Sequence, residues 1–555
     1  CGALFLTQDR PFGFWVNNDN DEPAVTGTDP KPERDVPINQ RMYSVADGIW
    51  GRIETQRNLE DLARLWIRGV PPVKASDGYT VTLEIWPWSG NPHIRVYRAR
   101  ETDGGIGYLT NTTSAANQLA VVNEGGMNVD YGQSIGHISD GVPLVLPLAT
   151  GGGLSRSNFL FEASGAGTGQ IGLTIWKDDE PIAEHWQEVE FKDVKDMYEQ
   201  AYITQAIQKW PLMVETNLVS SFRVQNTQAL HPDDAAETAV FVHGWRMTHD
   251  DYEIFSDTMF KRLYWSGFQG RFASLRWPTR SLDTDLPYIE YLTYNRSEHI
   301  AFKSGAGTAG YLNDLRGRFP GHTVSVAAHS MGNIVMMETL KQLAAASQRP
   351  IDHYVMMQAA VPAHSFDTSV TNLPLFTTSE SRVPTPNTYH NYAAGVTNAL
   401  REDGEIVNFY NVEDFALSKW RLNQSWGTTG FAPWTPTIKP NTYLGYSTTG
   451  TSHLLQTNAW NTDLLLATLY GGYYTGPTRS VTAAHEIMPF VARPRSEAVG
   501  VQGGLGGQIQ GGELNLQDAG YGFTDASGDH SAQFNWNIQR LDLFYRQLHL
   551  NLFPQ

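Results

Sequence analysis

Residues 323–335, TVSVAAHSMGNIV, contain the local pattern that decides the fold of the C-terminal part of the chain. The β-branched and small residues at 323–328 predict a buried strand, and the run from Asn333 onward predicts a helix. Between them, AHSMG at 328–332 fits the small-x-Ser-x-Gly pattern of a tight strand-to-helix turn. Such a turn strains the serine backbone and exposes the hydroxyl above the sheet. The sequence therefore predicts that Ser330 is a nucleophile.

The neighbours of Ser330 agree with this prediction. Gly332 supplies the small residue that the turn requires after the serine, and Ala328 stands where the pattern usually has glycine. The N–H of Met331, at the start of the predicted helix, is a candidate donor to an oxyanion beside Ser330. The alternative is a buried strand that is followed by an ordinary loop serine.

The surrounding sequence alternates between predicted strands and helices from about residue 236 onward. This alternation indicates a largely parallel sheet that is flanked by helices. The predicted strands are 239–242, 272–277, 323–328, 352–357, 406–410 and 513–516, and the predicted helices include 256–266, 298–319 and 534–548. We therefore assign residues 236–555 to one α/β domain, with insertions near 362–400 and 418–480. Insertions after parallel strands lie over the carboxyl edge of the sheet, so we interpret both as lid or substrate-pocket elements.

A serine nucleophile needs a base, and the base needs an acid that orients it. The acid is expected shortly after a later parallel strand, and Asp414 follows the predicted strand 406–410. Glu413 is the alternative, and we prefer Asp414 because the chain needs a residue or two before a carboxylate can face Ser330. Either carboxylate could instead cap a helix that starts at Phe415.

The base is expected on a loop shortly before a final helix. His530 follows the Gly/Asp-rich loop 520–529 and precedes the helix that we predict at 534–548. His485 is the alternative, but no clear strand precedes it. His329 is expected to point away from Ser330, although the two residues are adjacent. We therefore predict His530 as the base.

The loop after the strand 239–242 is expected to supply a second oxyanion donor. His243-Gly244-Trp245 occupies this place, and Gly244 permits a close backbone approach to the nucleophile. The N–H of Trp245 is our candidate donor, and one such donor contributes about 2.7–4 kcal/mol to catalysis. The alternative is that His243 and Gly244 only form a tight turn.

The N-terminal part of the chain has a different pattern. Residues 1–70 are acidic and Pro-rich, whereas residues 71–194 contain short alternating runs that are separated by Gly-rich loops. The latter pattern is typical of an all-β, sandwich-like domain. Residues 195–235 are predicted to be a helical linker. No catalytic arrangement is visible in the β domain.

Composition limits the partners of the protein. The formal net charge is −18, which argues against nucleic acid and against charge-driven binding to anionic membranes. No apolar run is long enough for a transmembrane segment. The chain has one cysteine, Cys1, so a disulfide within the chain is excluded, and Cys1 is a candidate lipid anchor or a fragment boundary. Asn17, Asp19 and Asp21 could direct oxygens at one Ca²⁺, although a solvated acidic loop is the alternative.

Four motifs together resemble an α/β-hydrolase of the lipase/esterase type: VHGW at 242–245, AHSMG at 328–332, NFYNVED at 408–414 and DHS at 529–531. The chain order of serine, acid and histidine also agrees with that fold. More loosely, the chain resembles hydrolase modules of large bacterial surface or secreted proteins, in which a β-rich region precedes the hydrolase. The resemblance implies acyl transfer through a serine ester, with no metal or cofactor required.

The sequence therefore predicts a serine hydrolase that acts on small carboxylic esters through Ser330, His530 and Asp414. An amidase or peptidase could use the same residues. A third interpretation is a non-catalytic surface protein whose β domain mediates self-assembly or binds a cell-surface partner. The near absence of cysteine and the acidic composition suit an exported bacterial protein that is extracellular, periplasmic or on the cell surface.

Overall fold

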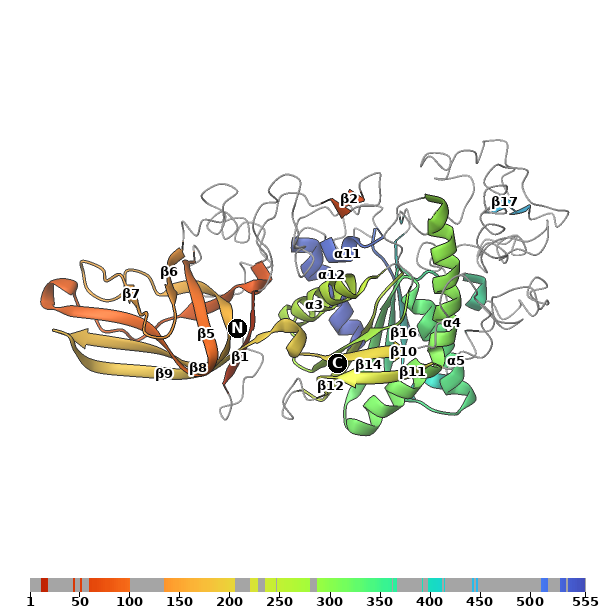
Figure 1. Cartoon of the computed structure of the whole chain (residues 1–555), viewed down its shortest axis with the longest axis horizontal. Helices are drawn as coiled ribbons and strands as arrows, with labels where there is room; N and C mark the ends of the chain where they lie inside the picture. The colour runs from red at the N-terminus through yellow and green to blue at the C-terminus, as the bar shows by residue number, and fades with distance from the viewer. Residues whose placement is uncertain are drawn as a thin grey trace.

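Two β-sheets organise the chain in the computed structural model (Figure 1). The structure describes residues 11–17, 43–44, 50–51, 59–99, 134–204, 220–227, 235–245, 247–279, 287–361, 363–366, 392, 398–411, 414, 442–443, 446–447, 511–517, 530–535 and 538–554. Within these residues, a seven-stranded sheet comes from the N-terminal part and an eight-stranded sheet from the C-terminal part. No helix among the described residues is both long enough and apolar enough to cross a membrane.

The first sheet contains β1 (Phe12–Val16), β4 (Ala63–Trp66), β5 (Tyr79–Arg98), β6 (Ser134–Ile138), β7 (Leu144–Leu146), β8 (Asn158–Lys177) and β9 (Glu180–Asp193). The long strands β5 and β8 pair along their whole lengths, and their register shifts between Pro87 and Ile94. On either side of this irregularity β5 has different partners, because β7 pairs with its first half and β6 with its second half. One buried cluster nevertheless contains Val81 and Val96 from the two halves. The predicted β-rich domain is therefore present, and the two long strands β5 and β8 contribute to both of its halves.

Two predicted boundaries are wrong. β1 and β4 belong to the first sheet, although we expected this sheet to begin after residue 70. The helical linker predicted at 195–235 instead contains β10 (Glu199–Thr204) and β11 (Ser221–Gln225), which lie at the edge of the second sheet. The spacing of Tyr198, Ala201 and Tyr202 fits one face of a helix, which explains the error. Parallel pairing with β13 buries all but the last residue of β10, so no strand-like alternation is visible in the sequence.

The second sheet has the strand order β11-β10-β13-β12-β14-β15-β16-β19. Its remaining strands are β12 (Glu237–Val242), β13 (Arg271–Arg276), β14 (Thr323–His329), β15 (His353–Met357), β16 (Ile406–Tyr410) and β19 (Glu513–Asn515). All neighbouring strands are parallel except β11, which runs antiparallel to β10. The predicted, largely parallel sheet is therefore confirmed.

Helices cover both faces of the second sheet (Figure 1). The helices are α3 (His249–Trp265), α4 (Pro287–Arg318), α5 (Gly332–Ala345), α11 (Ala532–Asn535) and α12 (Ile538–Leu552). Val240 of β12 packs in the cluster that contains α4 and α5, whereas its neighbour Phe241 packs in the cluster that contains α3 and α12. Successive residues of each central strand therefore bury their side chains on opposite faces.

Several further elements are short. They are η1 (Leu59–Asp61), η2 (Ala75–Asp77), η3 (Val194–Asp196), η4 (Ala363–Phe366), β2 (Tyr43–Ser44), β3 (Trp50–Gly51), β17 (Thr442–Tyr443) and β18 (Tyr446–Ser447). Of these, η1 has a clear structural role, because it joins the first sheet to helix α3.

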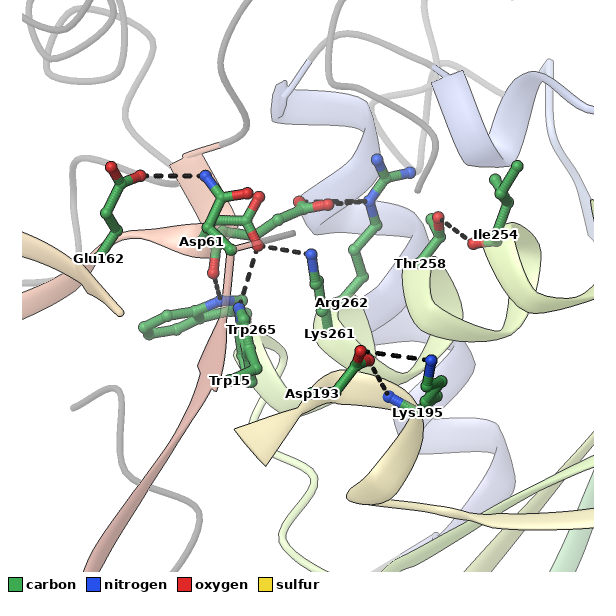
Figure 2. Close-up of polar contacts among 12 residues, drawn as sticks. Trp15, Asp61, Glu162, Asp193, Lys195, Ile254, Thr258, Lys261, Arg262 and Trp265 are labelled. Carbon is green, nitrogen blue, oxygen red and sulfur yellow. Dashed lines mark hydrogen bonds and ion pairs between the residues drawn. The ribbon is translucent and has the colours of Figure 1, made fainter. Parts of the chain in front are cut away.

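Buried ion pairs connect η1 to α3 (Figure 2). Lys261 Nζ lies 2.5 Å from Asp61 Oδ1, and the two side chains are 0% and 1% exposed. Arg262 Nε lies 3.1 Å from Glu60 Oε1, and Trp15 of β1 donates a hydrogen bond to Asp61. The N-terminal sheet is thus fixed to the second sheet by charges that have little access to water.

We expect Lys261→Met to lower the free energy of unfolding by about 3–5 kcal/mol, because it leaves the buried Asp61 carboxylate without its cation. The matched control is Lys195→Met, which removes a partly exposed pair with Asp193 and should cost about 0–1 kcal/mol. Chemical denaturation followed by tryptophan fluorescence measures both changes. Equal, small effects would contradict the structural role of the buried pair.

Candidate active site

The predicted site residues lie at one edge of the second sheet. Ser330 directly follows β14, Asp414 follows β16, and His530 lies between β19 and α11. Because these three strands run parallel, their carboxyl ends reach the same edge. Residues that are far apart in the sequence can therefore meet there.

The structure brings Ser330, His530 and Asp414 into one hydrogen-bonded line. His530 Nε2 lies 2.7 Å from Ser330 Oγ, and His530 Nδ1 lies 2.6 Å from Asp414 Oδ2. The Asp414 carboxylate is buried and also accepts a hydrogen bond of 2.8 Å from Gln358 Nε2. An ionised Asp414 keeps the imidazole proton on Nδ1, which leaves Nε2 free to accept the Ser330 hydroxyl proton. The alternatives Glu413 and His485 lie outside the described residues.

The turn at Ser330 has the strained backbone that the sequence predicts. Its φ is 53°, in the left-handed region that residues other than glycine rarely adopt. Four hydrogen bonds hold this conformation: Ser330 N donates to Met357 O, and the Ser330 carbonyl accepts from Ala360 N and from both the backbone N and the Nδ2 of Asn333. The strain is therefore offset by the strand and helix on either side of the turn.

Two glycines allow the loop after β12 to pack against this turn. A Cβ atom at Gly332 would lie 2.5 Å from the carbonyl oxygen of His243. A Cβ atom at Gly244 would lie 3.0 Å from the Cβ of Ser330. The predicted oxyanion segments, which contain Met331 and Trp245, thus flank Ser330 in the folded chain.

We expect Gly332→Ala to lower the free energy of unfolding by about 1–3 kcal/mol, because its new methyl group would meet a backbone carbonyl that cannot move freely. Gly317→Ala in α4 is the matched control, since a Cβ there has no neighbour within 4 Å. That change should alter stability by about 1 kcal/mol or less, in the stabilising direction. Thermal denaturation of both variants measures the difference. A Gly332→Ala protein as stable as the control would contradict the close packing.

His329 has a role that the sequence did not reveal. Its Nε2 lies 3.0 Å from the backbone carbonyl oxygen of His530, to which it donates, and its ring centroid lies 4.9 Å from that of His530. Burial lowers the pKa of His329 to about 3, and the nearby His530 adds to this lowering. A neutral His329 therefore holds the backbone at His530. The sequence feature that could have indicated this role is the position of His329 directly before Ser330.

His243 is the second buried, neutral histidine near the site. Its ring stacks on Trp277, with centroids 5.5 Å apart, and Nε2 accepts a hydrogen bond from Trp277 N. Its Nδ1 donates to the carbonyl oxygen of Gly244. Burial lowers the pKa of His243 to about 3. This ring fixes the loop that approaches Ser330.

Both histidines make the fold sensitive to acid. Each has a folded-state pKa of about 3 against an ordinary 6.5, so the unfolded chain binds more protons between these values. The free energy of unfolding should fall as the pH drops from 6.5 to 3, by up to ~1.4 kcal/mol per pH unit for each histidine. We expect His329→Gln to reduce this slope, whereas His185→Gln, at an exposed position, should leave it unchanged. Equal slopes in both variants, measured by denaturation at several pH values, would contradict a neutral His329.

Arg262 connects the site to the N-terminal sheet. Its guanidinium binds Glu60 of η1 and also donates from Nη1 to the carbonyl oxygen of Phe534 in α11. Helix α11 begins two residues after His530. One buried side chain therefore supports both the joint between the two sheets and the helix that follows the candidate base.

Some sequence predictions are not tested by the geometry. The Asn17 side chain donates a hydrogen bond of 3.0 Å to Glu162, but its predicted calcium-binding companions fall outside the described residues. The structure also does not describe Cys1 or most of the insertions 362–400 and 418–480, and the calcium-binding companions of Asn17 are Asp19 and Asp21. The calcium site, the lipid anchor and the lids therefore stay predictions.

Residues 220–407 match the model of a family that is described as an alpha/beta hydrolase of unknown function (DUF900). This part of the chain has the α/β-hydrolase fold. The match runs from β11 to the start of β16 and includes Ser330, whereas Asp414 and His530 follow it in the sequence. The resemblance inferred from the sequence motifs is thus confirmed at the level of the fold. No curated protein matches the chain.

Solved structures of three hydrolases show weak similarity. A Trichoderma reesei cutinase in complex with a phosphonate inhibitor is 15% identical, with 22% of this chain and 52% of that chain covered, at a TM-score of 0.17. A phospholipase from Legionella pneumophila is 12% identical, with coverages of 32% and 39%, at a TM-score of 0.20. A Pyrococcus horikoshii acylaminoacyl peptidase is 11% identical, with coverages of 45% and 39%, at a TM-score of 0.23. The chain thus spans about half or less of the length of each of these proteins.

Proposed function

We propose that the α/β hydrolase domain is a serine hydrolase that cleaves carboxylic esters through an acyl-enzyme. The observation that supports this most directly is the line of short contacts from Ser330 Oγ through the His530 ring to Asp414. A nucleophile, a base and a buried orienting acid in this order are the parts that acyl transfer needs.

The proposed reaction has two halves. In the first, His530 Nε2 takes the Ser330 proton as Oγ attacks the ester carbonyl carbon, and the same proton then goes to the departing alcohol. In the second, His530 takes a proton from water, whose oxygen attacks the acyl carbon. The bond from this carbon to Ser330 Oγ then breaks, His530 returns the proton to Oγ, and the acid is released. Asp414 stabilises the imidazolium in both halves. Because Asp414 is buried, water is excluded from this interaction, which is stronger in the protein interior than in water.

Two backbone N–H groups are proposed to stabilise the oxyanion. Met331 N stands at the N-terminus of α5, where the helix dipole favours negative charge. Trp245 follows Gly244, which packs directly against Ser330. Each such donor contributes about 2.7–4 kcal/mol to transition-state stabilisation. No residue in this scheme needs a metal or a cofactor.

Labelling with a fluorophosphonate probe tests the proposal. We expect stoichiometric modification of Ser330, which peptide mass mapping locates, and no modification of Ser330→Ala. His530→Gln and Asp414→Asn should each slow labelling by about 10⁴-fold. In His530→Gln the Ser330 hydroxyl lacks its base, and in Asp414→Asn the histidine lacks the partner that sets its tautomer. His185→Gln is the matched control and should label at the parent rate.

The same samples separate the alternatives. Hydrolysis of p-nitrophenyl butyrate without hydrolysis of the matched p-nitroanilide supports an esterase, whereas the reverse supports an amidase. A folded protein that neither reacts with the probe nor hydrolyses either compound would overturn the catalytic proposal and favour a non-catalytic surface protein.

A further inference from the structure

The outer face of the N-terminal sheet carries tryptophans on three neighbouring strands. In β5, Val81, Leu83 and Ile85 face the buried core, so the alternation of the strand places Trp86 on the opposite face. In β8, Ile171 and Ile175 face the core and Trp176 lies opposite. In β9, Val189 and Phe191 face the core and Trp186 lies opposite. These strands are adjacent in the order β9-β8-β5, so the three indoles share one surface, here called the tryptophan face.

Two of these rings lie across the sheet. Gly172 of β8 pairs with Trp186, and a Cβ atom at Gly172 would lie 2.3 Å from the six-membered ring of Trp186. The absence of a side chain at Gly172 therefore gives that ring its place over the strand. Trp176 donates a hydrogen bond of 2.8 Å from Nε1 to Thr82, so its ring reaches from β8 toward β5. Thr174 lies on the same face and is only 1% exposed, as expected beneath such a cover.

The same face exposes apolar surface to water. Trp86 is 64% exposed, and Val145 of β7, which pairs with Thr82 of β5, is 60% exposed. Exposed apolar groups that gather on one surface mark a site of interaction. Polar side chains stand between the rings: Glu84 pairs with Gly172, and Gln170 pairs with both Trp86 and Glu188.

This combination fits the chemistry of a sugar chain. The apolar C–H face of a pyranose ring packs on the face of an indole, because the π-system is negative and the C–H groups are positive. Carboxylate and amide oxygens accept hydrogen bonds from sugar hydroxyls. Glu84, Glu184 and Glu188 repel anionic lipids and nucleic acids, so an uncharged ligand fits better. We propose that the tryptophan face binds an uncharged polysaccharide and thereby holds the hydrolase on a polysaccharide surface.

Binding of the full-length protein to polysaccharides tests this proposal. Insoluble cellulose and chitin are used in pull-down assays, and xylan and glucomannan in affinity electrophoresis. We expect retention by at least one of these four polymers, and about tenfold weaker retention of the double variant Trp86→Ala/Trp186→Ala. Trp66→Ala is the matched control, because Trp66 is also exposed (42%) but lies on β4, which pairs with the opposite end of β8. It should bind like the parent protein.

Other results would overturn the proposal. One is that none of the four polymers retains the protein, and another is that the double variant is retained as strongly as the parent. A third is that the parent binds lipid vesicles, or self-associates in sedimentation velocity, and the double variant does not. Ser330→Ala should bind as the parent does, so this test is independent of the proposed catalysis. An unchanged circular dichroism melting curve establishes that the double variant is folded.

Discussion

The hydrogen bond between His530 and Asp414 is the constraint on which the candidate site depends. It joins two loops that are more than one hundred residues apart in the sequence, and it sets the tautomer that faces Ser330. Each partner is held by further contacts, since Gln358 donates to Asp414 and His329 donates to the backbone of His530. The parallel sheet makes these contacts possible because it brings the ends of β14, β16 and β19 to one edge.

The N-terminal sheet is closely connected to this site. Its η1 segment supplies Glu60 and Asp61 to two adjacent cations of α3, and the four side chains are buried together (Figure 2). Arg262 extends the connection to α11, beside the His530 loop. Burying charges is costly unless each has a partner, so the two sheets are expected to separate only with a large loss of stability. The β-rich region is thus part of the framework of the hydrolase domain as well as a candidate binding surface.

Much of this arrangement could be predicted from the sequence. Six strands of the second sheet, β12 to β16 and β19, were predictable because their apolar runs are short and alternate with helices. Ser330 was predictable because the turn requires small neighbours. Asp414 was found from its place after a strand, and His530 from its place on a loop before the final helix. The structure brings these three residues together, whereas their catalytic roles stay proposals.

Other features depend on contacts that no local pattern encodes. β10 looks helical in the sequence because its apolar residues fit a helical spacing, and only its pairing with β13 identifies it as a strand. The His329 contact with His530, and the bridge from Arg262 to α11, join residues that are distant in the sequence. The tryptophan face was equally hidden, since the register of β5, β8 and β9 determines which side chains share a surface.

The most direct test of the central claim is detection of the acyl-enzyme itself. The protein is mixed with p-nitrophenyl butyrate, quenched in acid within milliseconds to seconds, and analysed by mass spectrometry of the intact chain and its peptides. We expect a butyryl adduct on Ser330 that appears with the first release of p-nitrophenol and decays as hydrolysis continues. Ester hydrolysis that persists in Ser330→Ala, or a butyryl group found only on other residues, would contradict it.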